Sequence, residues 1–258
     1  MKKYWHNFKK YRHLLVELVR KDIKVKYKRS YLGLLWTLLN PLLMMIVLTL
    51  VFSTLFKHNI PNFPVYLLTG KIIFDFFSQA TNGAMGSVIG GSSLLKKVYI
   101  PKYIFPLSKV LFAFVNLLFS LIALFIVMIV TKSPFNLTLL MLPLPLFYVF
   151  LFSLGLGLIL ATYTVFFRDI MHLYGVVLTA WMYFTPLFYP AEILPSNISW
   201  ILGINPLYHS IQMLRDIVLY NKIPTLMNNL VCLSFGVITL LIGLFVFYKK
   251  QDDFILSI

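Results

Sequence analysis

Acidic residues are scarce in this sequence: Asp and Glu together number 8 among 258 residues, against 23 Lys and Arg. Charged residues of both signs make up only 12% of the chain, while hydrophobic residues make up 60%. An average soluble domain carries about 25% charged and about 45–50% apolar residues. The composition therefore excludes an ordinary soluble domain and indicates a membrane protein.

The residues that most enzyme and metal sites need are also missing. The single cysteine, Cys232, cannot form a disulfide within the chain, and the histidines are scattered without ligand-like spacing. Gly70-Lys71 is followed by Ile72 and lacks the upstream glycine of a phosphate-binding loop. We therefore expect no metal, no catalytic residue and no nucleotide cofactor in this chain. Asp252 and Asp253 alone are too little for a glycosyltransferase site.

Six hydrophobic stretches are long enough to cross a hydrocarbon core of about 30 Å, which takes about 20 residues of helix. They occupy residues 31–56, 64–89, 106–130, 143–167, 170–189 and 226–248. The period-two alternation typical of barrel strands is absent. The sequence predicts an all-α integral membrane protein with six transmembrane helices, forming a single domain over residues 1–258.

The basic residues predict the orientation of these spans, because Lys and Arg near span ends are retained in the cytoplasm. With the N-terminus inside, 18 of the 23 Lys and Arg fall in inner segments, and 11 of these lie between Lys2 and Arg29. Both termini are therefore expected to be cytoplasmic. Attraction to anionic headgroups explains the net charge of +15 without nucleic acid as a partner.

Residues 1–30 have the pattern of an amphipathic helix at the membrane interface. Apolar residues recur mostly every third or fourth position: Trp5, Phe8, Tyr11, Leu15, Leu18, Val19 and Ile23. Lysines and arginines, including Lys24, occupy the other face. The simpler alternative is an anchor that only sets topology.

Two loops differ from simple connections. In the inner loop, residues 91–105, a serine can cap a short helix that carries Leu94, Leu95, Lys96, Lys97 and Val98 and stops before Pro101. Such a helix suits docking to a soluble partner, although it could be a lysine-anchored turn.

The outer loop, residues 190–225, contains apolar segments too short to span. They predict short re-entrant helices, or a purely structural cap.

Two features within the spans suggest a path for a polar substrate. Lys71 and Asp75 lie one helical turn apart, and ionisable groups in a membrane are costly unless they are paired or hydrated. They could line a channel or only form a static salt bridge. Aromatic residues at the end of the fifth span could form a sugar-compatible surface or an ordinary interfacial belt: Trp181, Tyr183, Phe184, Phe188 and Tyr189.

Several motifs, in this order, resemble those of the permease subunits of type-2 ABC exporters. They are SYLGLLWTLLNPLL from Ser30 to Leu43, FRDI from Phe167 to Ile170, FTPLFYP ending at Pro190, and INPLY from Ile204 to Tyr208. The chain is most similar to the branch that exports polysaccharides and polyol phosphates. The resemblance covers essentially the whole chain.

The resemblance implies two permease copies and two ATPase subunits that bind ATP and Mg²⁺. Together they would move lipid-linked O-antigen, capsule or teichoic acid across the bacterial cytoplasmic membrane by alternating access. It implies a gate helix before Ser30, an outer gate within residues 190–225, and ATPase coupling through Leu94 to Tyr99 and through Arg168 and Asp169. The gate-helix candidates are Trp5, Phe8, Lys24, Lys28 and Arg29. The rival functions are export of a drug or lipid, and a membrane scaffold without transport.

Overall fold

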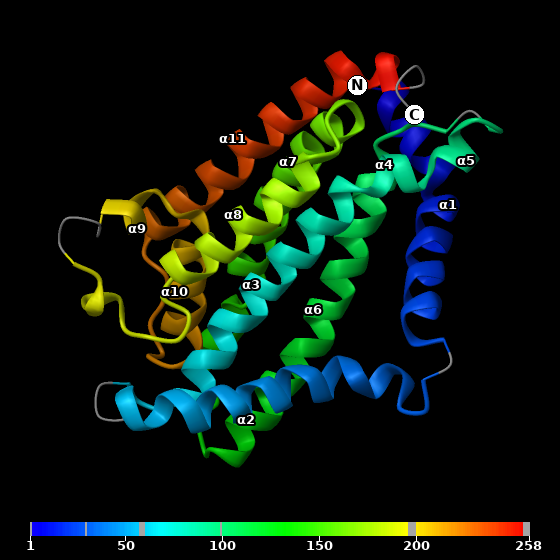
Figure 1. Ribbon diagram of the computed structural model, residues 1–258. Coiled ribbons are helices and arrows are strands. Elements are labelled where there is room, and N and C mark those ends of the chain that lie inside the picture. The colour runs from blue at the N-terminus through cyan, green and yellow to red at the C-terminus, as the bar shows by residue number, and fades with distance from the viewer. Residues whose placement is uncertain (1, 29, 57–59, 99, 196–199, 255–258) are drawn as a thin grey trace.

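The computed structural model describes the backbone of residues 2–28, 30–56, 60–98, 100–195 and 200–254, and the side chains in these ranges from residue 10 onward except 53–56. All regular elements in these ranges are helices (Figure 1). The α-helices are α1 Lys2–Tyr27, α2 Trp36–Phe56, α3 Phe63–Met85, α4 Ser87–Gly90, α5 Ser92–Leu95, α6 Ile104–Val130, α7 Pro143–Phe166, α8 Ile170–Phe184, α9 Trp200–Ile204, α10 Pro206–Val218 and α11 Leu226–Lys250. Short 3-10 helices cover Gly33–Leu35, Leu137–Met141, Ala191–Ile193 and Gln251–Asp253.

Within the described residues, 4 helical segments are long and apolar enough to cross a membrane: Gly33–Phe52, Ile104–Val130, Leu137–Phe166 and Leu226–Asp253. The chain is therefore an integral membrane protein with several spans. Two of the six expected spans are not in this set. α8 has only 15 residues, and α3 carries Lys71 and Asp75 together with further polar residues on its length.

The fifth expected span ends earlier as a helix than the hydropathy pattern predicted. α8 stops at Phe184, and Thr185 adopts an extended conformation with φ −97° and ψ 124°. Thr185 precedes Pro186, and the ring of a proline disfavours helical backbone in the residue before it. The expected short helices between the fifth and sixth spans are present as α9 and α10.

The main hydrophobic core surrounds α3, which packs between α6 and α7. On its far side α7 packs along α11, and here glycines bring the two backbones together. A Cβ atom at Gly243 would lie 2.3 Å from the carbonyl oxygen of Gly155, closer than real Cβ contacts come. The pair therefore depends on glycine at both positions.

Different elements gather at the two ends of the helix bundle (Figure 1). The start of α1, the end of α11, α5 and the turn between α7 and α8 lie at one end, and α9 and α10 lie at the other (Figure 1). The first end carries Lys96, Lys97, Arg168, Lys249 and Lys250, so we call it the basic end, and we call the other the α10 end. At the basic end, α1 runs alongside the start of α6 rather than through the bundle.

Candidate functional site

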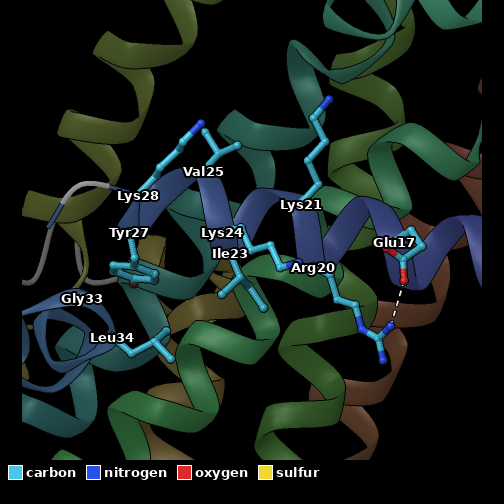
Figure 2. A pocket seen from close by; sticks show the side chains of 10 residues that line it. All are labelled: Glu17, Arg20, Lys21, Ile23, Lys24, Val25, Tyr27, Lys28, Gly33 and Leu34. Atoms are coloured by element: carbon cyan, nitrogen blue, oxygen red, sulfur yellow. Dashed lines mark hydrogen bonds and ion pairs between the residues drawn. The ribbon is translucent and has the colours of Figure 1, made fainter.

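The last turns of α1 form one wall of a basic pocket, with a volume of about 680 Å³. Its other wall is the turn around Gly33 and Leu34, where Gly33 has φ +47°, a left-handed conformation that favours glycine. Figure 2 shows Lys21 and Lys28 projecting to one side of α1, and Arg20 to the other, toward Glu17. The cations of this pocket are Arg20, Lys21, Lys24 and Lys28.

Two of the predicted gate-helix residues, Lys24 and Lys28, therefore lie in one pocket and are exposed. Arg29 and the side chains of Trp5 and Phe8 lie outside the described residues. Of the cations in the pocket, Arg20 forms an ion pair of 2.8 Å with Glu17. Clustered Lys and Arg side chains are suited to a phosphate or pyrophosphate group.

The opposite face of α1 packs on the protein. Leu15 is buried against Ile104 and Phe105 at the start of α6, as the amphipathic pattern allows. Asp22 on α1 accepts two hydrogen bonds from Lys109 Nζ, at 2.8 and 2.9 Å, which ties α1 to α6. Further along, burial lowers the pKa of the Lys26 ammonium.

Lys71 and Asp75 form an ion pair with each other, one turn apart on α3. They line a groove of about 630 Å³ between α2, α3 and α6. The groove also contains Lys26 of α1 and a set of neutral polar side chains: Tyr27, Thr37, Asn40, Ser78, Gln79, Asn116 and Ser120. This polar groove lies along helices that are otherwise apolar.

Gln79 and Asn116 hold α3 and α6 together at this groove, because Asn116 Nδ2 donates to Gln79 Oε1 at 2.9 Å. Asn116 also accepts a hydrogen bond of 3.5 Å from the Tyr27 hydroxyl. Neither residue was among those expected from the sequence to line a channel. Helical spacing could have identified Gln79, because it lies one turn beyond Asp75 on the same face of α3.

The predicted aromatic residues near the end of α8 do not line this groove. Trp181 faces the core: its indole ring packs on Phe77, with ring centroids 5.0 Å apart, and Nε1 donates to Asn205 Oδ1 at 2.9 Å. Tyr183 and Phe184 are exposed on the surface of α8. The Tyr189 hydroxyl donates to the carbonyl of Tyr183. The structure thus separates the aromatic group from Lys71 and Asp75.

Asn205 joins two of the proline-containing motifs. Its Oδ1 caps α10 by accepting from the backbone N–H groups of Leu207 and Tyr208, and its Nδ2 donates to Thr185 Oγ1 at 2.9 Å. An Asn at this position satisfies N–H groups that have no partner inside the helix. The residues before Pro186 and Pro206 are therefore linked directly, although sequence reasoning treated their motifs as separate signals.

Arg215 on α10 is 1% exposed and lies among apolar side chains. Its guanidinium stacks over the Tyr66 ring at 3.4 Å and donates through Nη2 to the carbonyls of Leu187 and Tyr66, at 3.2 and 3.4 Å. Burial lowers the pKa of Arg215 to about 10, so it stays cationic near neutral pH. Sequence reasoning counted it only as a loop charge, but its neighbours Ile211 and Val218 on the same helical face are apolar.

The two segments predicted to face an ATPase both lie at the basic end (Figure 1). In the first, Lys96, Lys97 and Val98 are exposed. Leu94 and Leu95 are instead half-buried against the cores beneath α1 and α4. Tyr99 lies outside the described residues.

The second segment is the turn between α7 and α8. Arg168 and Asp169 are exposed there. The Asp169 carbonyl accepts from the backbone N–H groups of His172 and Leu173, which starts α8. Each segment thus presents charged side chains at the same end of the bundle.

Several known proteins are similar to this chain over most of its length. A family model described as ABC-2 type transporter matches residues 13–219. The O-antigen export system permease protein RfbA of Myxococcus xanthus is 30% identical, over 96% of this chain and 96% of that protein. RfbA of Klebsiella pneumoniae is also 30% identical, over 93% of each chain. The polysialic acid transport protein KpsM of Escherichia coli is 23% identical, over 93% of this chain and 94% of that protein.

The match to the family model covers most of the chain, and the similarity to the relatives runs nearly from end to end. Membership of this family implies a partner ATPase. The chain belongs to the ABC-2 type transporter family, as a membrane permease rather than an enzyme.

Proposed function

We propose that this chain is the channel-forming subunit of an ATP-driven exporter of lipid-linked polysaccharide. The observation that carries this proposal is full-length similarity to permeases named for O-antigen and polysialic acid transport. The substrate would be of the O-antigen, capsule or teichoic acid type. The exporter would lie in the bacterial cytoplasmic membrane and consist of two copies of this chain and two ATPase subunits.

In this proposal α3 and α8 complete a set of six spans, and both termini are cytoplasmic. The basic residues support this orientation, because the basic end carries the cations of α1 together with Lys96, Lys97, Lys249 and Lys250. The α10 end then faces outward, with α9 and α10 as an outer gate. A polar groove beside α3 supports its place in the membrane, since paired and hydrogen-bonded groups are tolerated there.

ATP and Mg²⁺ would be bound by the partner ATPase, whose movements would reach this chain through Lys96, Lys97, Val98, Arg168 and Asp169. The exposure of these residues supports such a contact. Leu94 and Leu95 would act differently from a docking pair. They are half-buried, so they would transmit movement of the exposed residues to α1 and α6.

The basic pocket on α1 suits the pyrophosphate of a carrier lipid, whose chain would stay in the bilayer. α1 would act as a gate. A second cavity of about 490 Å³ between α1, α3 and α6, lined by Asp22 and Lys109 among others, leaves room for α1 to move and supports this role. The sugars would follow the polar groove beside Lys71, which offers amide and hydroxyl groups to sugar hydroxyls. The exposed aromatic side chains of α8, Tyr183 and Phe184, would face this path across the two-copy assembly.

Purification from the native membrane tests this proposal. A separate ATPase should co-purify and hydrolyse ATP, and Lys96→Glu with Lys97→Glu should abolish its association. Lys132→Glu is the matched control, because this exposed lysine lies after α6, away from the basic end. If the unaltered chain purifies alone without nucleotide turnover, a scaffold becomes the better account.

A flux measurement tests the substrate. Deletion of this chain should trap lipid-linked glycan on the inner face of the membrane. If export of glycan continues and efflux of a drug or lipid stops, the substrate assignment is wrong.

Lys71→Met tests the proposed path of the sugars. Normal export and normal substrate affinity in this variant would show that the Lys71–Asp75 pair is only structural.

A further inference from the structure

The chain that follows α11 turns back into the protein. After the 3-10 helix Gln251–Asp253, the side chain of Phe254 is 0% exposed. Its ring meets those of Phe166 and Phe247 edge-on, with centroids 5.9 and 5.3 Å apart. The rest of its buried cluster is apolar: Val88, Leu158, Ala161 and Val165.

A lysine from another part of the chain, Lys102, binds this segment from outside. Lys102 Nζ donates to the backbone carbonyl of Gln251 and lies 5.7 Å from the centroid of the Phe254 ring. Lys250 Nζ lies 5.8 Å from the centroid of the Phe166 ring. A cation near an aromatic ring is attracted by its electrons. Phe254 is therefore held by apolar packing below and by Lys102 at the surface, while Lys250 contacts the neighbouring ring of Phe166.

The neighbours of Phe254 come from both segments proposed to meet the ATPase. Leu95 and Tyr103, which flank the exposed residues 96–98, pack against this cluster. Phe166, on its other side, is the last residue of α7 and stands two positions before Arg168. Phe254 thus lies between the two segments, which are separated in sequence by more than 60 residues.

We propose that Phe254 is a positioning residue that makes the two ATPase-facing segments move as one unit. This inference rests on the proposed function, because it needs an ATPase at the basic end. A close-packed aromatic side chain transmits displacement, since protein interiors yield little to compression. Without the ring, a push on residues 96–98 would be taken up by the space left behind and would not reach the turn at Arg168.

The readout is the amount of glycan exported per ATP hydrolysed by the whole complex in membranes. Phe254→Ala should lower this ratio by about 5-fold or more, the size of a typical coupling between sites. ATPase association should stay close to that of the unaltered chain, because the exposed coupling residues are intact. Phe254→Leu, which keeps most of the apolar volume, should recover much of the ratio. A purely structural residue would lower the amount of complex and leave the ratio unchanged.

If Phe254→Ala does not accumulate in the membrane, Lys102→Met answers the same question. It removes the hydrogen bond to Gln251 and the cation over the ring while Phe254 remains, and it should also lower the ratio. A normal ratio in a variant that binds the ATPase overturns the role of Phe254 and leaves the proposed function standing. Absence of an ATPase from the unaltered chain overturns both.

Discussion

The α7–α11 pair and α2 are both built from long apolar helices, yet they are held in opposite ways. At Gly155, an added Cβ would lie 2.5 Å from backbone atoms of Thr239 and Leu240. Along the described part of α2, Thr37 is the one buried side chain, and a groove of about 630 Å³ lies behind its first half. Equal hydrophobicity therefore says little about which helix is fixed and which can move.

The two regions are therefore expected to differ in rigidity. Backbones in contact leave no room for sliding, so α7 and α11 form a fixed frame. α2 joins the bundle through few buried side chains and contains Pro41, which cannot donate a backbone hydrogen bond to Thr37. It follows the turn at Gly33, so the loosely held part of the molecule begins at this turn and continues through α2.

The largest effect is expected from Gly155→Val, which forces side-chain atoms into the backbone of α11. We expect a loss of about 3 kcal/mol in stability, at the upper end of the overpacking range. Thermal unfolding in detergent measures it. Gly175→Val on α8 is the matched control, because nothing lies within 4 Å of its Cβ position. Similar losses at both glycines would show that α7 and α11 are not the fixed frame.

Arg215→Met tests whether the α10 end belongs to the fixed region as well. It removes the ring stacking on Tyr66 and leaves the Leu187 carbonyl without its buried donor, so we expect a loss of about 2 kcal/mol. Increased proteolysis between α8 and α11 would report the release of α10. Arg215→Lys keeps the charge but not the planar stacking, and should be intermediate. No change in proteolysis would show that α10 is held by apolar packing alone.

Lys109→Met should loosen α1 with a smaller cost, about 1 kcal/mol, because the ion pair with Asp22 is only partly buried. Hydrogen exchange of the α1 amides should rise, and the difference from the unaltered chain should shrink in high salt. Glu17→Gln breaks an exposed ion pair on the same helix and serves as the control, with almost no expected effect. If hydrogen exchange of the α1 amides is the same in the two variants, the ion pair between Asp22 and Lys109 is not what holds α1 on α6.

The smallest effect is expected from Leu50→Ala on α2. Its side chain is 71% exposed, so the change should alter stability by less than about 0.5 kcal/mol. Leu158→Ala on α7 is the contrast: it is 2% exposed, and the change should cost about 2 kcal/mol, the lower end of the range for Leu→Ala in a core. A large loss at Leu50 in the membrane-extracted protein would instead indicate that a second copy covers α2.

Hydropathy and helical spacing predicted the helical fold, the short helices after α8 and the single-face placement of Lys71 and Asp75. They did not predict which way the leucines of α5 point, because Leu94 and Leu95 contact helices distant in sequence. They also did not predict the hydrogen bond from the Trp181 indole to Asn205, or the burial of Arg215 and Phe254. Each depends on a partner that local periodicity cannot identify. The ATPase-facing, gate and channel roles stay predictions.

The polar face of α3 has a consequence for how the protein enters its membrane. Lys and Asp at the centre of a helix each cost about 2.5–3.5 kcal/mol during insertion by the translocon. α3 carries one of each, with Gln79 beyond them, and is not among the helices apolar enough to insert on composition alone. We expect α3 to enter the bilayer only once α6 supplies Asn116 to Gln79. In the proposed six-span arrangement, the polar side chains of α3 would therefore make its membrane integration depend on α6.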